Sequence, residues 1–427
     1  MGVPRSLAFA ARATKEPVPT QDGGSAVNSE SERLRSELPD RVARYGEALA
    51  AAGIGVALVQ QSVDKYYLSG TLQQGFLAVS AGMQPVLFCR KGVERARQET
   101  PWQVVPIDRP RDLPDLMREA GFPQDGAVGC EADVLPAQMW QQMERLFPER
   151  GVVDASLPLR LQRQVKSPFE LEEIRAAARV WRGIMEETAR QIRQGLDDHL
   201  LSVAVDAYGR NLGAQGIMRT RGFNFEYFAP HTLAGPPGAV PAHFDGPTGG
   251  LGPHAAIGQG SAHVAIQPGM PVLADFGVGV RGYVADGTRT FCLGELPPQL
   301  ARAAAVAVDI LSQAEETLRE GNSLKTLYRQ AVEHAEAEGL GEHFMGFARD
   351  RVRFLGHGIG LELDELPVLT PNAEGVLQSG MVVAIEPKFV FPGLGAVGVE
   401  DSFIIRQGPP ELLTDYPRGP VLLGSGR

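Results

Sequence analysis

The chain has 427 residues, 43% of them apolar, and a formal net charge of −10 with a pI near 5.4. This length exceeds the usual size of one domain, so we expect two domains. The acidic balance argues against a nucleic-acid partner, because phosphate contacts need clustered Lys and Arg. No apolar run approaches the roughly 18–20 residues that cross a bilayer, so no membrane partner is expected.

The cysteines are few and isolated: Cys89, Cys130 and Cys292. They form no CxxC pair, so neither a disulfide framework nor a cysteine zinc site is expected. A reducing, cytoplasmic location is the simplest interpretation.

Residues 1–36 are predicted to be a disordered tail. The segment is rich in polar residues, and its apolar run LAFAA is too short for a secretory signal.

Residues 37–163 show the alternation of an α/β domain, with short apolar runs separated by glycines and amphipathic segments. The predicted strands cover residues 56–60, 66–70, 76–80, 85–89, 104–108 and 127–131, and the predicted helices residues 41–52, 113–121 and 137–147.

A helix start marks the boundary to the second domain, residues 164–427. Ser167 is a good N-cap, Pro168 suits the first helical position, and Glu170 completes a capping box. Apolar residues then recur at helical spacing as far as Gly195. Further helices are predicted over residues 197–212, 298–319 and 323–338.

The stretch VLADFGVGVRGYVADGTRTFC, residues 272–292, places Asp275 and Asp286 inside apolar, strand-like runs joined by glycines. A buried carboxylate is costly unless it is paired, hydrogen-bonded or bound to metal. Three later stretches, FLGHGIGLELDELP, MVVAIEPKFVF and AVGVEDSFII, add His357, Glu386 and Glu400 in similar surroundings. Four carboxylates in one pocket need cations, and two bridged divalent ions would meet that need and activate a shared water.

In this order and spacing, the five residues resemble the metal ligands of the pita-bread metallopeptidases: Xaa-Pro aminopeptidases, prolidases, methionine aminopeptidases and creatinase. The likeness extends over nearly the whole chain. It implies a creatinase-type α/β domain over residues 37–163, followed by a pita-bread domain with a curved antiparallel sheet. The large N-terminal domain favours the prolidase and Xaa-Pro aminopeptidase branch.

The resemblance also implies roles. Asp275 would bind one ion, Asp286 and Glu400 would bridge, and His357 and Glu386 would complete the second site. Glu386 would also take a proton from the bridging water, and the Thr288 hydroxyl would support the ligands.

The chain departs from the family pattern on the substrate side. Asp364 stands where these peptidases usually carry a second histidine, and Gly398 where they carry an arginine. An anionic Asp364 cannot donate a hydrogen bond to an oxyanion. The remaining family histidine is assigned to His243, displaced by an apparent insertion in which His254 is a rival.

We therefore expect a metalloaminopeptidase that cleaves between an N-terminal residue and proline in a small peptide. The ions would be divalent, manganese first, with cobalt, zinc or iron as alternatives. By resemblance the protein would be a homodimer. Two other functions stay open: creatinase-like or lyase-like chemistry on a non-peptide small molecule, and a non-catalytic binding module.

Overall fold

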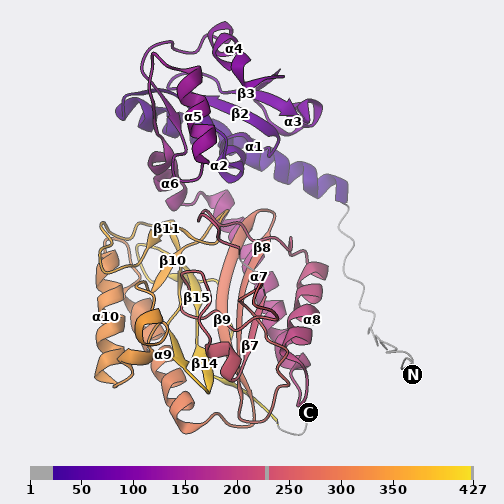
Figure 1. Ribbon diagram of the computed structural model, residues 1–427, viewed down its shortest axis with the longest axis vertical. Helices are drawn as coiled ribbons and strands as arrows, with labels where there is room; N and C mark the ends of the chain where they lie inside the picture. The colour runs from indigo at the N-terminus through magenta and orange to yellow at the C-terminus, as the bar shows by residue number, and fades with distance from the viewer. Residues whose placement is uncertain (1–22, 227–229, 425–427) are drawn as a thin grey trace, which may run out of the picture.

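The computed structural model describes residues 23–226 and 230–424, which form two lobes stacked along the long axis of the molecule (Figure 1). The N-terminal lobe ends with helix α6 (Ser156–Gln164), and α7 (Pro168–Gln191) begins the C-terminal lobe. No helix in the described ranges is long and apolar enough to cross a membrane.

The N-terminal lobe is built on one mixed sheet with strand order β4-β3-β2-β1-β5-β6. Its strands are β1 (Ile54–Val59), β2 (Gln74–Val79), β3 (Val86–Lys91), β4 (Gln103–Pro106), β5 (Ala127–Cys130) and β6 (Val152–Asp154). Helices α1 (Gly23–Ala51), α2 (Ser62–Ser69), α3 (Val93–Glu99), α4 (Leu113–Glu119) and α5 (Ala137–Leu146) complete it with α6. Five of the six predicted strands and all three predicted helices are confirmed.

The strand predicted over residues 66–70 is wrong, because this segment lies in α2. The Gln61 side chain caps the helix by accepting a hydrogen bond from Asp64 N, and Gly70 ends it with φ 74°. Tyr67 and Leu68 are fully buried on this short helix. Capping and the burial of one face outweigh the strand propensity of a Tyr-Tyr-Leu run.

The predicted tail also differs from the structure over residues 23–36, which belong to α1. Leu34 and Leu38 pack into the core of the N-terminal lobe, so this segment gains apolar burial that its polar composition conceals. Residues 1–22 lie outside the described part of the chain.

Helix α7 begins as the sequence predicts. The Ser167 hydroxyl accepts from Glu170 N, and the Glu170 carboxylate accepts from Ser167 N, completing the capping box. The other predicted helices are also confirmed, as α8 (Asp198–Asn211), α9 (Pro298–Thr317) and α10 (Leu324–Ala337). Short 3₁₀ turns lie at Pro110–Asp112, Pro236–Ala239, Gly341–His343 and Ala348–Asp350.

Two curved sheets form the centre of the C-terminal lobe. The first has the order β17-β9-β8-β7, and the second, antiparallel throughout, has the order β11-β10-β12-β15-β16. The strands are β7 (His231–Ala234), β8 (Pro271–Val280), β9 (Tyr283–Leu293), β10 (Gly356–Gly358), β11 (Glu365–Val368), β12 (Val382–Ile385), β15 (Asp401–Ile404), β16 (Glu411–Leu412) and β17 (Val421–Leu423). A separate hairpin pairs β13 (Lys388–Phe391) with β14 (Gly395–Gly398).

Helices cover the outer faces of these sheets. In Figure 1, α7 and α8 lie on the side of β7, β8 and β9, while α9 and α10 lie on the opposite side of the lobe. Trp181 and Met185 of α7 pack with Phe276 and Phe291 of the first sheet in one buried cluster. A second cluster joins α9 and α10 to β12, β13 and β15. This is the pita-bread arrangement, so the predicted fold class is confirmed.

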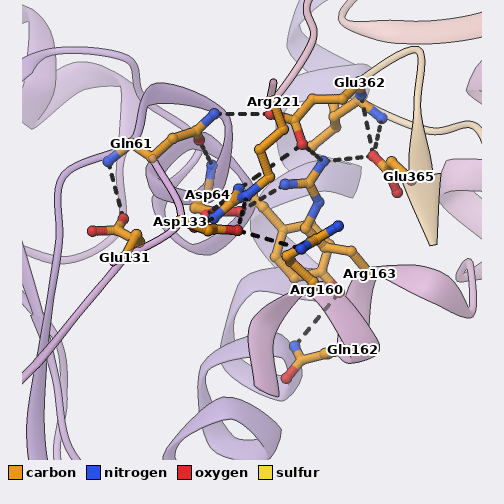
Figure 2. Close-up of polar contacts among 12 residues, drawn as sticks. Gln61, Asp64, Glu131, Asp133, Arg160, Gln162, Arg163, Arg221, Glu362 and Glu365 are labelled. Carbon is orange, nitrogen blue, oxygen red and sulfur yellow. Dashed lines mark hydrogen bonds and ion pairs between the residues drawn. The ribbon is translucent and has the colours of Figure 1, made fainter. Parts of the chain in front are cut away.

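A buried network of charges joins the two lobes (Figure 2). The Arg163 guanidinium of α6 donates to Asp64 Oδ1 at 2.6 Å, to Glu362 Oε2 at 2.8 Å and to Glu365 Oε1 at 2.5 Å. Arg221 donates to the other Asp64 oxygen at 2.7 Å. Leu363 and Asp364, which lie between Glu362 and Glu365, line a cavity of the C-terminal lobe, so the network fixes one wall of that cavity against the N-terminal lobe.

Replacing Arg163 with alanine tests how much this network contributes to the stability of the folded protein. The change leaves buried carboxylates without their cation, so we expect the free energy of unfolding to fall by about 3–5 kcal/mol, measured by urea denaturation. Arg160→Ala is the matched control on the same helix. Its ion pair with Asp133 spans 3.4 Å and is 31% exposed on the arginine side, so a loss below about 1 kcal/mol is expected. An equal fall in the free energy of unfolding in the two variants would contradict the stabilising role of the buried network.

Candidate metal centre

A cavity of about 510 Å³ opens between the two sheets of the C-terminal lobe. The five predicted ligands all line it: Asp275, Asp286, His357, Glu386 and Glu400. Their carboxylates are almost completely buried, with residue exposures between 1% and 8%. The structure therefore brings together the five residues that the sequence places far apart.

The β8–β9 hairpin holds the two aspartates on one face. Asp275 pairs with Thr288 across the hairpin, and Gly277 pairs with Asp286. Asp286 and Thr288 are two residues apart on β9, and side chains two apart on a strand share a face. Asp275 and Asp286 thus project diagonally toward the same cavity. The turn between the strands has positive φ at Arg281 and Gly282, as tight hairpin turns require.

The second sheet supplies the other ligands. His357 is the middle residue of β10, Glu386 directly follows β12, and Glu400 directly precedes β15. Backbone hydrogen bonds in both directions between Thr288 and Glu400 join the two sheets at this point. The Thr288 hydroxyl also donates to Glu400 Oε2 at 2.7 Å, which agrees with its predicted supporting role.

A lysine that the sequence analysis missed lies among these carboxylates. Lys388 is 2% exposed, and its Nζ donates to Glu386 Oε2 at 2.7 Å, Asp275 Oδ2 at 2.9 Å and Glu400 Oε2 at 3.1 Å. Its signal was visible in MVVAIEPKFVF, where it is the one cationic residue of an apolar run. An unexplained buried charge in a strand indicates a partner.

The charges of the site are not balanced by Lys388 alone. Burial raises the pKa of Asp286 well above its usual range, and the negative charges of Glu400 and Asp275 raise it further. Burial also raises the pKa of Glu386, against the opposing effect of Lys388. For Asp275 the lysine and His231 overcome burial and leave the pKa lowered. Lys388 also opposes the shift at Asp286, but of these two aspartates it makes an ion pair only with Asp275.

Three residues of the cavity, one of them also a partner of Lys388, fit a divalent ion. Asp286, His357 and Glu400 each offer one ligand atom, and these atoms lie within 4.8 Å of one another. Glu400 Oε1 is buried and has no hydrogen-bond partner within the described ranges. Two carboxylates and one imidazole suit several divalent metals. The chain can thus hold a metal ion at these three side chains.

A second missed residue, Arg289, lies behind the ligands. Its guanidinium is fully buried and donates to the Glu400 backbone oxygen at 2.7 Å and to Asp401 Oδ1 at 2.7 Å. It also bonds the backbone oxygens of Thr414 and Tyr416, and so connects β9 and β15 to the C-terminal segment. This arrangement fixes the backbone that carries Glu400.

The structure brings a different histidine to the cavity from those proposed. His243 and His254 are both exposed and do not line the cavity, although His243 touches the ring of Phe244. His231 of β7 is buried, lines the cavity and pairs with Asp275 across the sheet. Its Nε2 lies 3.3 Å from Gln259 Oε1, and burial lowers its pKa, which favours a neutral imidazole.

Asp364 lines the same cavity, in the loop that the interlobe network anchors at Glu362 and Glu365. Its Oδ1 is buried without a hydrogen-bond partner in the described residues. Burial raises the pKa of this carboxyl, and His357 partly opposes that shift. Position 364 therefore faces the site, as the sequence predicts, but its role there remains a proposal.

Comparison with known proteins agrees with the fold. The family model of metallopeptidase family M24 matches residues 172–407, and that of the creatinase/prolidase N-terminal domain matches residues 41–165. The first match includes the positions of all five predicted ligands and of Lys388.

Individual relatives extend over most of the chain. A Xaa-Pro dipeptidase of Pyrococcus furiosus is 22% identical over 385 residues, covering 89% of this chain and 99% of its own. The prolidase structure from Pyrococcus horikoshii OT3 superposes with a TM-score of 0.75 at 22% identity, covering 89% of this chain and 99% of that one. An X-Pro aminopeptidase structure from Thermotoga maritima gives 0.73 at 22% identity, covering 92% and 99%.

Asp286→Asn tests the metal centre directly. The amide removes one anionic ligand, so we expect affinity for Mn²⁺, measured by calorimetry on chelator-treated protein, to fall by roughly 100-fold or more. Asp309→Asn, an exposed aspartate on α9, is the control and should bind Mn²⁺ as the parent does. Unchanged affinity in Asp286→Asn would remove Asp286 from the centre.

Proposed function

This chain belongs to metallopeptidase family M24, and we propose that it hydrolyses the bond between an N-terminal residue and proline in a dipeptide or short peptide. The proposal depends most on one observation: Asp286, His357 and Glu400 converge at a cavity with room for a small peptide, and Glu400 Oε1 has no hydrogen-bond partner in the described part of the chain. The names of the relatives suggest the substrate class. The arrangement of the side chains in the cavity supports hydrolysis assisted by a metal ion.

The walls of the cavity suit a prolyl ring. Phe225 and Phe244 meet edge-to-face with their centroids 5.6 Å apart, and Leu363 and Val368 add apolar surface. Small-molecule sites commonly combine such apolar walls with a few polar groups that fix orientation. A prolyl ring would pack against these walls while the carbonyl of the preceding residue, which the water attacks, faces the ligands.

A divalent ion held by Asp286, His357 and Glu400 would supply Lewis acidity and an activated water. The side chains around the ion would transfer the proton and position the substrate. Glu386, with Oε1 3.6 Å from His357 Nε2, would accept the proton of the attacking water and pass it to the leaving nitrogen. His231, kept neutral by burial, would hold the substrate at the β7 side of the cavity. Manganese is the first expectation, with cobalt, zinc or iron as alternatives.

The carboxyl of Asp364 favours a second class of substrate, one that carries a positive charge. A carboxyl replaces the histidine expected at this position, so a cationic or guanidino group would fit beside it better than an oxyanion would. Creatinase-like or lyase-like chemistry on a non-peptide small molecule is therefore the second candidate. A cytoplasmic location and a homodimer are further parts of the proposal that rest on resemblance and composition alone.

A panel of substrates tests the proposed function. With Mn²⁺, Co²⁺ or Zn²⁺ added, the protein should release the N-terminal residue from Xaa-Pro dipeptides or a longer Xaa-Pro peptide. His357→Gln should lower kcat/KM by about 10²-fold or more, because a ligand is lost, whereas His334→Gln on α10 should leave it unchanged. Turnover of creatine-like compounds without Xaa-Pro cleavage would favour the second candidate. Metal binding without turnover of either class would contradict both.

Asp364→His tests the substrate side. An imidazole at this position can donate a hydrogen bond to the developing oxyanion, and single donors of this kind contribute about 10²–10³-fold in rate. We expect kcat for an Xaa-Pro dipeptide to rise by at least about 10-fold, with a smaller change in KM. Asp245→His, at another residue that lines the cavity, is the control. A loss of kcat in Asp364→His would show that the native carboxyl serves the reaction.

A further inference from the structure

The contacts of Lys388 resemble those of a bound cation. An ammonium has three N–H donors. Those of Lys388 reach one oxygen each of Asp275, Glu386 and Glu400, at 2.7–3.1 Å. Hydrogen bonds of this length to three carboxylates use the full donor capacity of the group. A metal ion shared by these same three oxygens would have to displace Nζ.

The carboxylates of the cavity divide into two sets around this ammonium. No hydrogen bond or ion pair joins Lys388 to Asp286, which instead groups with His357 and Glu400. Glu400 belongs to both sets. Its Oε2 accepts from Lys388 and Thr288, whereas its Oε1 is buried without a partner in the described residues. This carboxylate is placed to bridge the ammonium and one further cation.

The backbone opposite Lys388 makes room for its side chain. Lys388 and Gly398 are directly paired across the β13–β14 hairpin. A Cβ at position 398 would lie 2.7 Å from Lys388 Cγ, which is closer than real Cβ contacts come. The arginine that the family resemblance implies at 398 would meet the same obstacle. The lysine at 388 and the absence of a side chain at 398 thus belong to one packing arrangement.

We propose that the Lys388 ammonium permanently occupies one of the two cation positions of this cavity, so that the protein binds one divalent ion per chain. The ion is held by Asp286, His357 and Glu400, and Asp275 and Glu386 serve as partners of Lys388. One ammonium and one divalent ion place three positive charges against the four carboxylates. This inference rests on the proposed metal centre, and it replaces the two-ion expectation for this chain.

Metal stoichiometry tests the proposal without an activity assay. Full-length protein is stripped with chelator, titrated with Mn²⁺ by calorimetry, and analysed by elemental mass spectrometry after desalting. We expect one ion per chain in the parent and two in Lys388→Ala. Lys166→Ala is the matched control, because Lys166 is also buried and paired with a carboxylate, Glu365, outside the cavity. It should remain at one ion.

A second variant keeps the test independent of the folding of Lys388→Ala. Asp275→Asn alters a partner of the lysine, so Mn²⁺ affinity should stay within about 3-fold of the parent, whereas Asp286→Asn loses roughly 100-fold or more. Two ions in the parent, or an equal loss in both aspartate variants, would overturn the proposal and leave the metallopeptidase function standing. No ion in any variant would overturn both.

Discussion

Four buried carboxylates in one cavity are the constraint on which the C-terminal lobe depends. Their mutual repulsion must be offset by cations. Lys388 offsets part of it from within the chain by donating to Asp275, Glu386 and Glu400. The remainder, concentrated at Asp286, is what a divalent ion would neutralise. Affinity for metal and stability of the folded lobe are therefore linked, because an ion that binds only the folded state also stabilises it.

The rest of the structure holds this cluster in place. The two sheets meet at the Thr288–Glu400 bridge, and Arg289 fixes that junction from behind through the Glu400 backbone and Asp401. On the opposite side, the interlobe network around Arg163 anchors the loop that carries Asp364 (Figure 2). The described residues of the N-terminal lobe include none of the proposed metal ligands, but this lobe buries part of the C-terminal lobe and supports the wall that a substrate would meet.

Much of this arrangement could be predicted from the sequence, because local patterns carry it. The capping box at Ser167 and the strand-like runs around Asp275 and Asp286 gave the correct helix start and hairpin. Short segments were harder: residues 66–70 have strand propensity, yet form a capped helix. Side-chain partners were least accessible. Whether His231 or His243 reaches the cavity depends on how β7 pairs with β8. The role of Lys388 depends on Asp275, which lies far away in the sequence, as well as on the nearer Glu386 and Glu400.

Anomalous diffraction from crystals grown with Mn²⁺ measures the central claim most directly. Data collected at the manganese absorption edge locate each ion independently of any assumed ligand set. The account predicts one anomalous peak per chain, within coordination distance of Asp286, His357 and Glu400, with Lys388 still bonded to Asp275 and Glu386. Two peaks bridged by Glu400, with the Lys388 side chain displaced from the cavity, would contradict it.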